Sequence, residues 1–285
     1  MPKLGIIGGS GLYHMEGLKN PQWVRMDTPF GEASDRFLCA ELLGMDIVFL
    51  PRHDKGHRLL PCELNYPANI YGMKKLGVDM IVSVSAVGSL KQEIKPLDIV
   101  IPDQYVDRTS QSRKTTFFGN GIAAHIAFAE PTCPVLAGLL YKIAKSLGLP
   151  VFMGGTYLNM EGPAFSTKAE SSLYRSWGMD IIGMTNMPEA KCAREAEICY
   201  ATMAMVTDYD CWHGSEGVSV DIIIQNIIKN VDNAKKILRG LIPKLPQERK
   251  CICANALKDA IVTKPDAISD EVKQRLDVII GKYVQ

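Results

Sequence analysis

The chain has 285 residues, of which 47% are hydrophobic and 22% charged, a globular composition that excludes an intrinsically disordered protein. Its 32 basic and 31 acidic residues give a net charge of +1, which supplies no field for nucleic acid or anionic lipid. No apolar run approaches the ~18 residues of a membrane helix, and the first residues are too glycine-rich for a signal peptide. We therefore expect a cytoplasmic protein with no nucleic-acid and no membrane partner.

Strand and helix patterns alternate along the chain. Short apolar or β-branched runs predict strands at residues 3–8, 37–43, 45–50, 80–87, 98–102, 151–160, 180–184 and 200–206. Apolar residues at helical spacing predict helices at 65–76, 134–147, 167–176, 188–199, 218–238 and 270–283. This alternation is typical of α/β folds. We predict one domain over residues 1–285, a central mixed, mostly parallel sheet flanked by helices, with a helical tail from about residue 245.

Eight cysteines are the unusual feature of the composition, at positions 39, 62, 133, 192, 199, 211, 251 and 253. In a chain of this length and expected location, free and mostly buried thiols are the default. A zinc site favours two close pairs of ligands, whereas only Cys251 and Cys253 are close in sequence, and no histidine is near them. We expect no structural zinc.

Three predicted strands end in groups that suit an anion. The turn Gly8-Gly9-Ser10-Gly11 follows the first strand, Arg52 and His53 follow the 45–50 strand, and residues 83–89 bring hydroxyls to the end of a third. Taken singly, each is also compatible with a tight turn or a solvated loop that binds nothing, and the glycine turn matches neither the dinucleotide fingerprint nor the P-loop. Open α/β sheets bind ligands outside the carboxyl ends of their strands. Together the three strand ends predict a phosphate site.

Two aspartates follow the strand at 200–206. Asp208 and Asp210 are two residues apart, so on extended backbone both carboxylates face the same side. Neighbouring carboxylates push their pKa values apart, which suits a proton donor near neutral pH. A magnesium site and a simple helix-capping role are alternatives that the residues alone leave open.

A series of motifs carries a resemblance to a known family. In chain order these are Gly5-Ile6-Ile7-Gly8-Gly9-Ser10-Gly11-Leu12, Pro51-Arg52-His53, Asn65-Tyr66-x-Ala68-Asn69-Ile70, Ser85-Ala86-Val87-Gly88-Ser89-Leu90, Glu161-Gly162-Pro163-x-Phe165-Ser166-Thr167-x-Ala169-Glu170, Met184-Thr185-x-x-Pro188-Glu189 and Thr207-Asp208-Tyr209-Asp210-Cys211-Trp212. From about residue 4 to about residue 240 the chain closely resembles the methylthioadenosine phosphorylases of the trimeric purine nucleoside phosphorylase family. The tail is similar only to some members, notably archaeal-type ones with a Cys-x-Cys near the end.

The resemblance implies roles for individual residues. The family's phosphate pocket falls on Ser10, Arg52, His53, Ser85, Ala86 and Thr185. The nucleoside-binding and catalytic positions fall on Asp208 and Asp210 for adenine, Phe165 for base stacking, Met184 for the ribose, Val220 for the methylthio group and His125, which the neighbouring subunit contributes. A homotrimer follows, with pairing of trimers into hexamers left open.

The implied reaction is the phosphorolysis of methylthioadenosine to adenine and 5-methylthioribose 1-phosphate, as in methionine and purine salvage. Inorganic phosphate is a co-substrate, and no metal or cofactor is expected. A phosphorylase of methylthioinosine or of other purine nucleosides is the nearest alternative, and a magnesium enzyme using the same aspartates is a weaker one. From a different class come a non-catalytic nucleoside sensor and a thiol-redox protein built on Cys251 and Cys253.

Some positions depart from the family pattern or leave a question open. Ala164 stands where methylthioadenosine phosphorylases commonly have arginine, and Ser10 replaces the threonine of animal relatives while keeping the hydroxyl. Cys133 and Cys199 match positions that are disulfide-bonded in some archaeal-type relatives. The resemblance therefore leaves a Cys133–Cys199 bridge open, although free thiols are the expectation.

Overall fold

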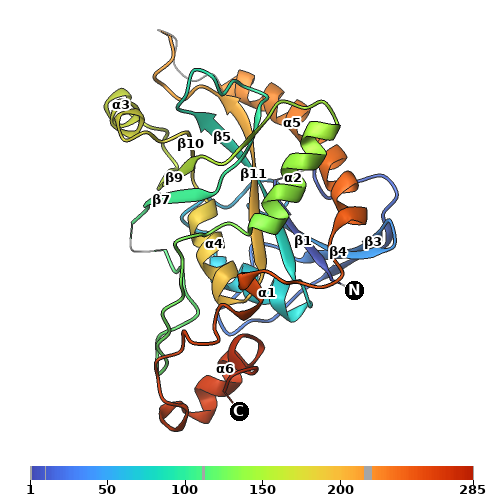
Figure 1. The fold of residues 1–285 in the computed structure, drawn as a ribbon, viewed down its shortest axis with the longest axis vertical. Coiled ribbons are helices and arrows are strands. Elements are labelled where there is room, and N and C mark those ends of the chain that lie inside the picture. The colour runs from blue at the N-terminus through green and yellow to red at the C-terminus, as the bar shows by residue number, and fades with distance from the viewer. Residues whose placement is uncertain (1, 10, 111–112, 215–219, 285) are drawn as a thin grey trace.

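The computed structural model describes residues 2–9, 11–110, 113–214 and 220–284 (Figure 1). The strands are β1 (Leu4–Gly8), β2 (Lys19–Val24), β3 (Phe37–Leu42), β4 (Met45–Pro51), β5 (Met80–Ser89), β6 (Ile99–Ile101), β7 (Gln104–Arg108), β8 (Val151–Met153), β9 (Thr156–Met160), β10 (Ile181–Gly183) and β11 (Cys199–Asp208). The α-helices are α1 (Tyr66–Lys75), α2 (Pro134–Ser146), α3 (Lys168–Ser176), α4 (Asn186–Glu195), α5 (Val220–Leu241) and α6 (Asp270–Ile280). Short 3₁₀ segments lie at Ile242–Lys244, Ile252–Asn255 and Pro265–Ala267.

The described strands form one mixed sheet. Its main path has the order β2-β3-β4-β1-β5-β10-β9-β7, and β11, β6 and β8 branch from β5. The pairs β1–β4, β1–β5, β5–β11, β6–β8, β9–β10 and β7–β9 are parallel, whereas β2–β3, β3–β4, β5–β10 and β6–β11 are antiparallel. The α/β fold with a mostly parallel sheet flanked by helices is therefore confirmed. Because β4, β1, β5 and β11 are parallel neighbours, their carboxyl ends meet at one edge.

Helices cover both faces of the sheet (Figure 1). Successive side chains of a strand point to opposite faces, so β11 supplies Tyr200 to one apolar layer and Met203 to the other. The first layer contains side chains of α1, α4 and α6, and the second contains those of α2 and α5. Burial of these two layers fixes the sheet between the helices and holds its carboxyl edge in place.

Two strands, β2 and β7, were not predicted, and one predicted strand is split into two, β8 and β9. The edge strand β2 is mostly exposed, so it lacks the apolar pattern that would have revealed it, and β7 is short and polar. The strand predicted at 151–160 is broken by Gly154 and Gly155, whose φ angles of +87° and +106° no strand accommodates. The two halves then pair with different neighbours, β8 with β6 and β9 with β10 and β7.

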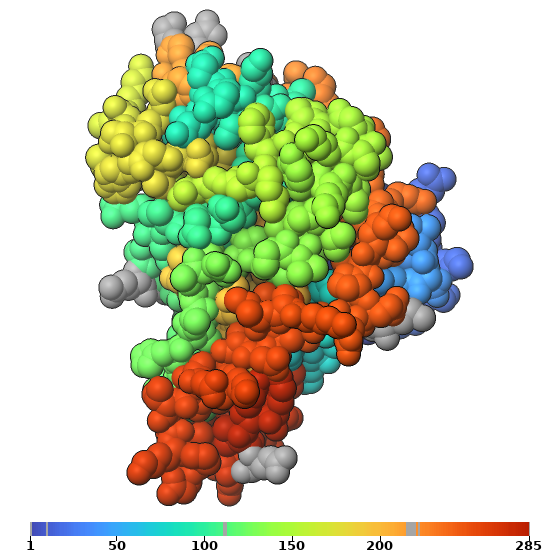
Figure 2. All heavy atoms as spheres, in the orientation of Figure 1, coloured from blue at the N-terminus to red at the C-terminus, as the bar shows by residue number. Residues whose placement is uncertain are grey.

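The carboxy-terminal tail packs against the body of the protein. Arg275 of α6 donates to the backbone oxygen of Gly119, and an antiparallel bridge joins Ala124 to Ile261. Figure 2 shows the tail, in orange-red, beside the green segment that contains these residues. Leu276, fully buried, belongs to the same apolar layer as α1 and α4. In the described part of the chain, no helix has the length and apolarity to cross a membrane.

Candidate active site

A cavity of about 470 Å³ opens at the carboxyl ends of β1, β4, β5 and β11. Its volume lies in the range of small-molecule sites, which is roughly 300–1,000 Å³. The predicted site residues that line it are Arg52, His53, Ser85, Ala86, Phe165, Met184, Thr185, Asp208 and Asp210. The fold thus collects into one pocket side chains that lie more than 150 positions apart in the sequence.

Arg52 lies at the base of this pocket in a buried ion pair with Glu189 of α4. Its Nε is 2.5 Å from Oε1 and its Nη2 3.3 Å from Oε2, while Ser83 Oγ and Tyr200 Oη also donate to Glu189. Burial opposes the charge of Arg52, but the attraction of Glu189 raises its pKa above the usual value. The edge of the guanidinium formed by Nε and Nη2 is therefore occupied by Glu189 and is not free to bind an oxyanion.

One N–H of the Arg52 guanidinium, on Nη1, has no acceptor among the described residues. Nη1 carries two hydrogens, and among the described residues the contact on this nitrogen is a single one, to the backbone oxygen of Val84 at 3.0 Å. A second N–H is thus left for an anion. The positive charge, in contrast, is matched locally by Glu189, so Arg52 acts on a ligand mainly as an oriented donor.

His53 is neutral at physiological pH. Burial and the adjacent charge of Arg52 lower its pKa to about 4. Its Nδ1 lies 2.8 Å from the backbone oxygen of Leu59, and because a carbonyl only accepts, Nδ1 carries the proton. Nε2 is consequently an acceptor, suited to the protonated oxygen of monohydrogen phosphate rather than to an ionised one. The ring stacks on His57, with centroids 4.5 Å apart.

The amino terminus of α4 adds donors of fixed orientation. Thr185 is the N-cap residue of this ten-residue helix, and it is buried at the pocket wall. A helix begins with backbone N–H groups that lack acceptors within the helix and carry a partial positive charge. Ser85 and Ala86 of β5 lie on the same wall. The hydroxyl groups of Ser85 and Thr185 and the start of α4 therefore lie in the pocket wall, in the kind of position where proteins bind anions.

Asp208 and Asp210 line the pocket at the end of β11, where Asp208 pairs with Gly88, three positions beyond Ser85 on β5. The pKa of Asp208 is raised to about 6, mainly by burial and to a smaller extent by the charge of Asp210. A hydrogen bond from the Thr207 hydroxyl at 2.6 Å acts in the opposite direction. Burial also raises the pKa of Asp210, whose Oδ2 has no hydrogen-bond partner among the described residues. Burial thus raises the pKa of both carboxyl groups, and Asp210 Oδ2 is left available to a polar ligand.

Gly88 of β5 has no side chain to fill the space next to the two aspartates. A Cβ atom there would lie 3.4 Å from Asp208 Oδ2, 3.5 Å from Asp210 Cβ and only 3.1 Å from Ile182 Cγ2. Glycine thus permits β5 and β11 to bring both carboxyl groups to the same opening. On α5, Asn226 donates to the backbone oxygen of Thr207 at 2.7 Å, which ties the helix to the end of β11.

The walls between the two polar ends are apolar. Ile223, Ile227 and Val231 of α5 line one side, and Met184 and Phe165 line another. Phe165 is 54% exposed, so one face of its ring is free to stack.

Arg113 fixes the backbone beneath the Met184 side. Its Nη1 donates to the Met184 carbonyl at 2.6 Å, and its Nε pairs with Glu161 at 2.9 Å. Arg113 belongs to the stretch 109–121, which has no helix or strand in its described part. Its buried guanidinium nevertheless holds that loop against the pocket.

Three predicted site residues are not placed in the cavity. Ser10 lies outside the described residues, and Val220 begins α5 without a described side chain. His125 is exposed and away from the cavity of its own chain, with its backbone N–H donating to the Ala260 oxygen.

Several residues of the site were missed by sequence reasoning. Glu189 stood in a quoted motif without a role, because nothing in the sequence pairs it with Arg52, 137 positions earlier. The apolar residues of α5 read as ordinary core packing, although a helix that begins directly after a strand-end loop can wall a pocket. Arg113 carried no signal beyond being one of two adjacent basic residues, with Lys114, in a polar stretch.

Comparisons with known proteins agree on one family. The sequence profile of the Phosphorylase superfamily matches residues 3–243. The S-methyl-5'-thioadenosine phosphorylase of Geobacter sulfurreducens is 60% identical over 282 residues, covering 99% of each chain. That of Koribacter versatilis is 55% identical over 282 residues, covering 99% of this chain and 96% of its own.

Solved structures give the same picture. A methylthioadenosine phosphorylase from an antarctic soil metagenomic library superposes with a TM-score of 0.93 at 50% identity, covering 98% of both chains. The methylthioadenosine phosphorylase of Schistosoma mansoni in complex with tubercidin gives 0.82 at 33% identity, covering 90% of this chain and 96% of the other. Profile, sequence and fold match over most or all of the chain, and the chain therefore belongs to the phosphorylase superfamily.

Proposed function

We propose that the protein catalyses the reversible phosphorolysis of 5′-methylthioadenosine to adenine and 5-methylthioribose 1-phosphate. The observation that carries this proposal is the arrangement of one cavity, in which anion donors around Arg52 and a carboxyl pair at Asp208 and Asp210 are separated by apolar walls. A phosphate co-substrate needs the anion donors, the sugar of a nucleoside fits the apolar walls, and its base can bond to the carboxyl pair. The names of the relatives, which are 46–60% identical over nearly the whole chain, support the same substrate.

In this reaction phosphate attacks C1′ while the bond from C1′ to the purine nitrogen breaks. The electron pair of that bond leaves with the base, so the sugar becomes cationic and the purine anionic in the transition state. Phosphate is held by Thr185, Ser85 and the free N–H of Arg52. From there its negative charge stabilises the positive charge on the sugar. A protonated Asp208 gives a hydrogen bond or a proton to N7 and so neutralises the departing base.

The carboxyl pair also selects the base. The exocyclic amino group of adenine donates to an ionised carboxylate, while N7 accepts from a protonated one. A 6-oxopurine has a carbonyl at position 6 and would meet the same carboxylate as a second acceptor. Since a buried polar group left unpaired costs about 1–3 kcal/mol, Asp208 and Asp210 should favour 6-aminopurines.

The 5′ end of the substrate would lie against α5. Ile223 and Ile227 make this wall apolar, and we assign Val220, at the start of the helix, to the same pocket. A methylthio group buries apolar surface there, whereas a 5′-hydroxyl loses water without gaining a partner. We expect kcat/KM for methylthioadenosine to exceed that for adenosine by about tenfold or more.

We further propose a homotrimer in which His125 of each subunit completes the pocket of its neighbour. Its exposure on the chain surface, away from its own cavity, leaves it available for such a contact. Ser10, which follows Gly9 in the sequence, would add a hydroxyl to the phosphate pocket. Measurement of the mass in solution, together with activity after His125→Ala, tests the assembly.

The decisive experiment is the release of adenine from methylthioadenosine with and without phosphate. Release that requires phosphate, with formation of a sugar 1-phosphate, supports phosphorolysis. Release in water alone would indicate a hydrolase, and binding without release would indicate a sensor. Comparable kcat/KM for methylthioinosine would replace the 6-aminopurine assignment with the 6-oxopurine one.

A further inference from the structure

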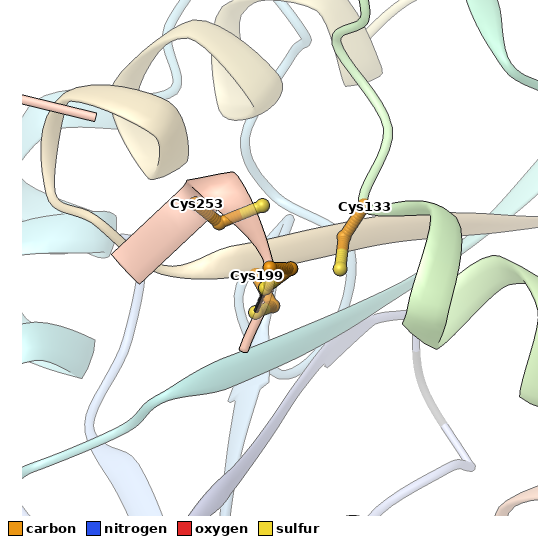
Figure 3. A group of neighbouring side chains, drawn as sticks. Cys133, Cys199 and Cys253 are labelled. Atoms are coloured by element: carbon orange, nitrogen blue, oxygen red, sulfur yellow. Dashed lines mark hydrogen bonds between the residues drawn. The ribbon is translucent and has the colours of Figure 1, made fainter. Parts of the chain in front are cut away.

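Four cysteines that are far apart in sequence meet at the amino end of β11. Cys133 precedes α2, Cys199 begins β11, and Cys251 and Cys253 lie on the tail at the 3₁₀ segment Ile252–Asn255. All four Sγ atoms lie within 4.8 Å of one another. Figure 3 shows the side chains of Cys133, Cys199 and Cys253 converging from their three separate segments. As expected from the sequence, these four are free thiols, and three of them are buried, but their spacing along the chain did not predict that they gather in one place.

The distances fit a single metal ion. Zinc bound by four thiolates has Zn–S bonds of about 2.3 Å, which places the sulfurs of a regular tetrahedron about 3.8 Å apart. The Sγ atoms of Cys199 and Cys251 are 3.2 Å apart, and the 4.8 Å limit includes every other pair. Small movements of side chains would thus complete a tetrahedron, and four sulfurs in that geometry select zinc over hard cations that prefer oxygen.

We propose that Cys133, Cys199, Cys251 and Cys253 form a structural tetrathiolate site for one zinc ion. On binding, each thiol releases its proton to solvent, so that four protons leave as one Zn²⁺ enters and the site carries a net charge of −2. No bond between sulfurs forms and no oxidant is needed. The proposal does not rest on the phosphorolysis proposed above.

The position of the site gives it a structural role. Cys199 and Asp208 are at opposite ends of β11, about 30 Å apart along the strand at about 3.3 Å per residue, so the zinc cannot reach the substrate cavity. It would instead join the tail to the start of β11 and to α2. Arg249 already holds this part of the tail, through hydrogen bonds to the backbone oxygens of Asp79 and Glu197.

The test measures zinc in the purified protein after growth with zinc and passage over a chelating resin. We expect about one zinc per chain, lost in Cys199→Ser and in Cys253→Ser. Cys192→Ser is the matched control, since Cys192 is also fully buried but lies outside the cluster, and it should retain the ion. Should the cluster variants fold poorly, wild type still decides, because a mercurial reagent that titrates thiols should release its zinc stoichiometrically.

Two further readouts exclude other chemistry. Replacement of zinc by cobalt should give the visible bands of tetrahedral thiolate-bound Co²⁺ in wild type and in Cys192→Ser. Denatured, metal-free protein should titrate eight thiols, the number in the sequence. Fewer thiols without zinc would mean disulfides, eight thiols without zinc would mean an unliganded cluster, and iron in place of zinc would mean a different centre. Each of these results overturns the proposal, as does zinc that survives Cys199→Ser.

Discussion

The buried pair of Arg52 and Glu189 allows binding of phosphate to be separated from folding. Both side chains are at most 4% exposed, and Glu189 accepts from Arg52, Ser83 and Tyr200. Arg52→Met removes the cation and leaves the carboxylate buried with two neutral donors. A second substitution, Glu189→Gln in the Arg52→Met background, removes the charge while its amide oxygen still accepts from Ser83 and Tyr200.

The expected magnitudes follow from burial. Breaking a buried ion pair by removing one partner costs about 3–5 kcal/mol, because the remaining charge is stranded. At about 2–4 °C per kcal/mol for chains of comparable size, Arg52→Met should lower Tm by roughly 6–20 °C. Arg52→Met with Glu189→Gln should regain at least half of that loss. The lost hydrogen bond to phosphate, about 1.5–3 kcal/mol, should raise the phosphate KM by about 10–150-fold in both variants.

Two assays on the same proteins decide the matter. Denaturant unfolding gives the stability of wild type, Arg52→Met and the double variant, and initial rates at varied phosphate give KM and kcat. If the double variant recovers both stability and phosphate KM, Arg52 acts only by holding Glu189, and its N–H does not bind phosphate. If Arg52→Met is as stable as wild type, the ion pair is not the buried, mutually dependent pair described above.

The remaining predictions concern the base and the backbone of the pocket. Because the pKa of Asp208 is raised to about 6, its proton is present below that pH and lost above it, so kcat/KM should decline as pH rises past 6. Asp208→Asn should lack this decline. Dividing the pH profile of kcat/KM for wild type by that for Asp208→Asn cancels the effect of phosphate ionisation. Parallel profiles would exclude Asp208 as the proton donor. Asp208→Asn should also reduce or invert the preference for methylthioadenosine over methylthioinosine, measured as kcat/KM for both. Gly183→Ala should lower Tm by at least several degrees, since its Cβ would lie 1.9 Å from the hydroxyl of the fully buried Tyr157. An unchanged Tm would show that the backbone of β10 can shift to make room for the methyl group.

The fold was predictable where local pattern decides it. Short apolar runs at β1, β4, β5 and β11 and the amphipathic spacing of α2 and α5 are each sufficient for an element. The edge of the sheet that holds the cavity follows from the rule for parallel strands, so the glycine turn, Arg52 and Ser85 could be assigned to one site from the sequence, whereas Asp208 joined them through the family resemblance.

Pairings made over long stretches of chain were not predictable. Glu189 meets Arg52 across 137 positions, and Cys251 meets Cys199 across 52, so no spacing within the sequence indicates either contact. Both are set by which helix or tail segment packs over which end of a strand. A count of ligands close in sequence therefore does not reveal clusters that long-range packing assembles in a chain with many buried cysteines.

The charge balance around phosphate bears on how the proposed reaction is accelerated. Glu189 matches the charge of Arg52, and His53 is neutral because burial and Arg52 lower its pKa to about 4. In the proposed complex, phosphate would therefore be held by N–H and O–H dipoles and by the start of α4, and most of its negative charge would remain uncompensated. Substrate nucleosides are neutral at C1′, whereas the transition state is cationic there. The attraction between phosphate and sugar thus becomes strong only as the bond to the base breaks, which is binding energy that appears in the transition state and not before it.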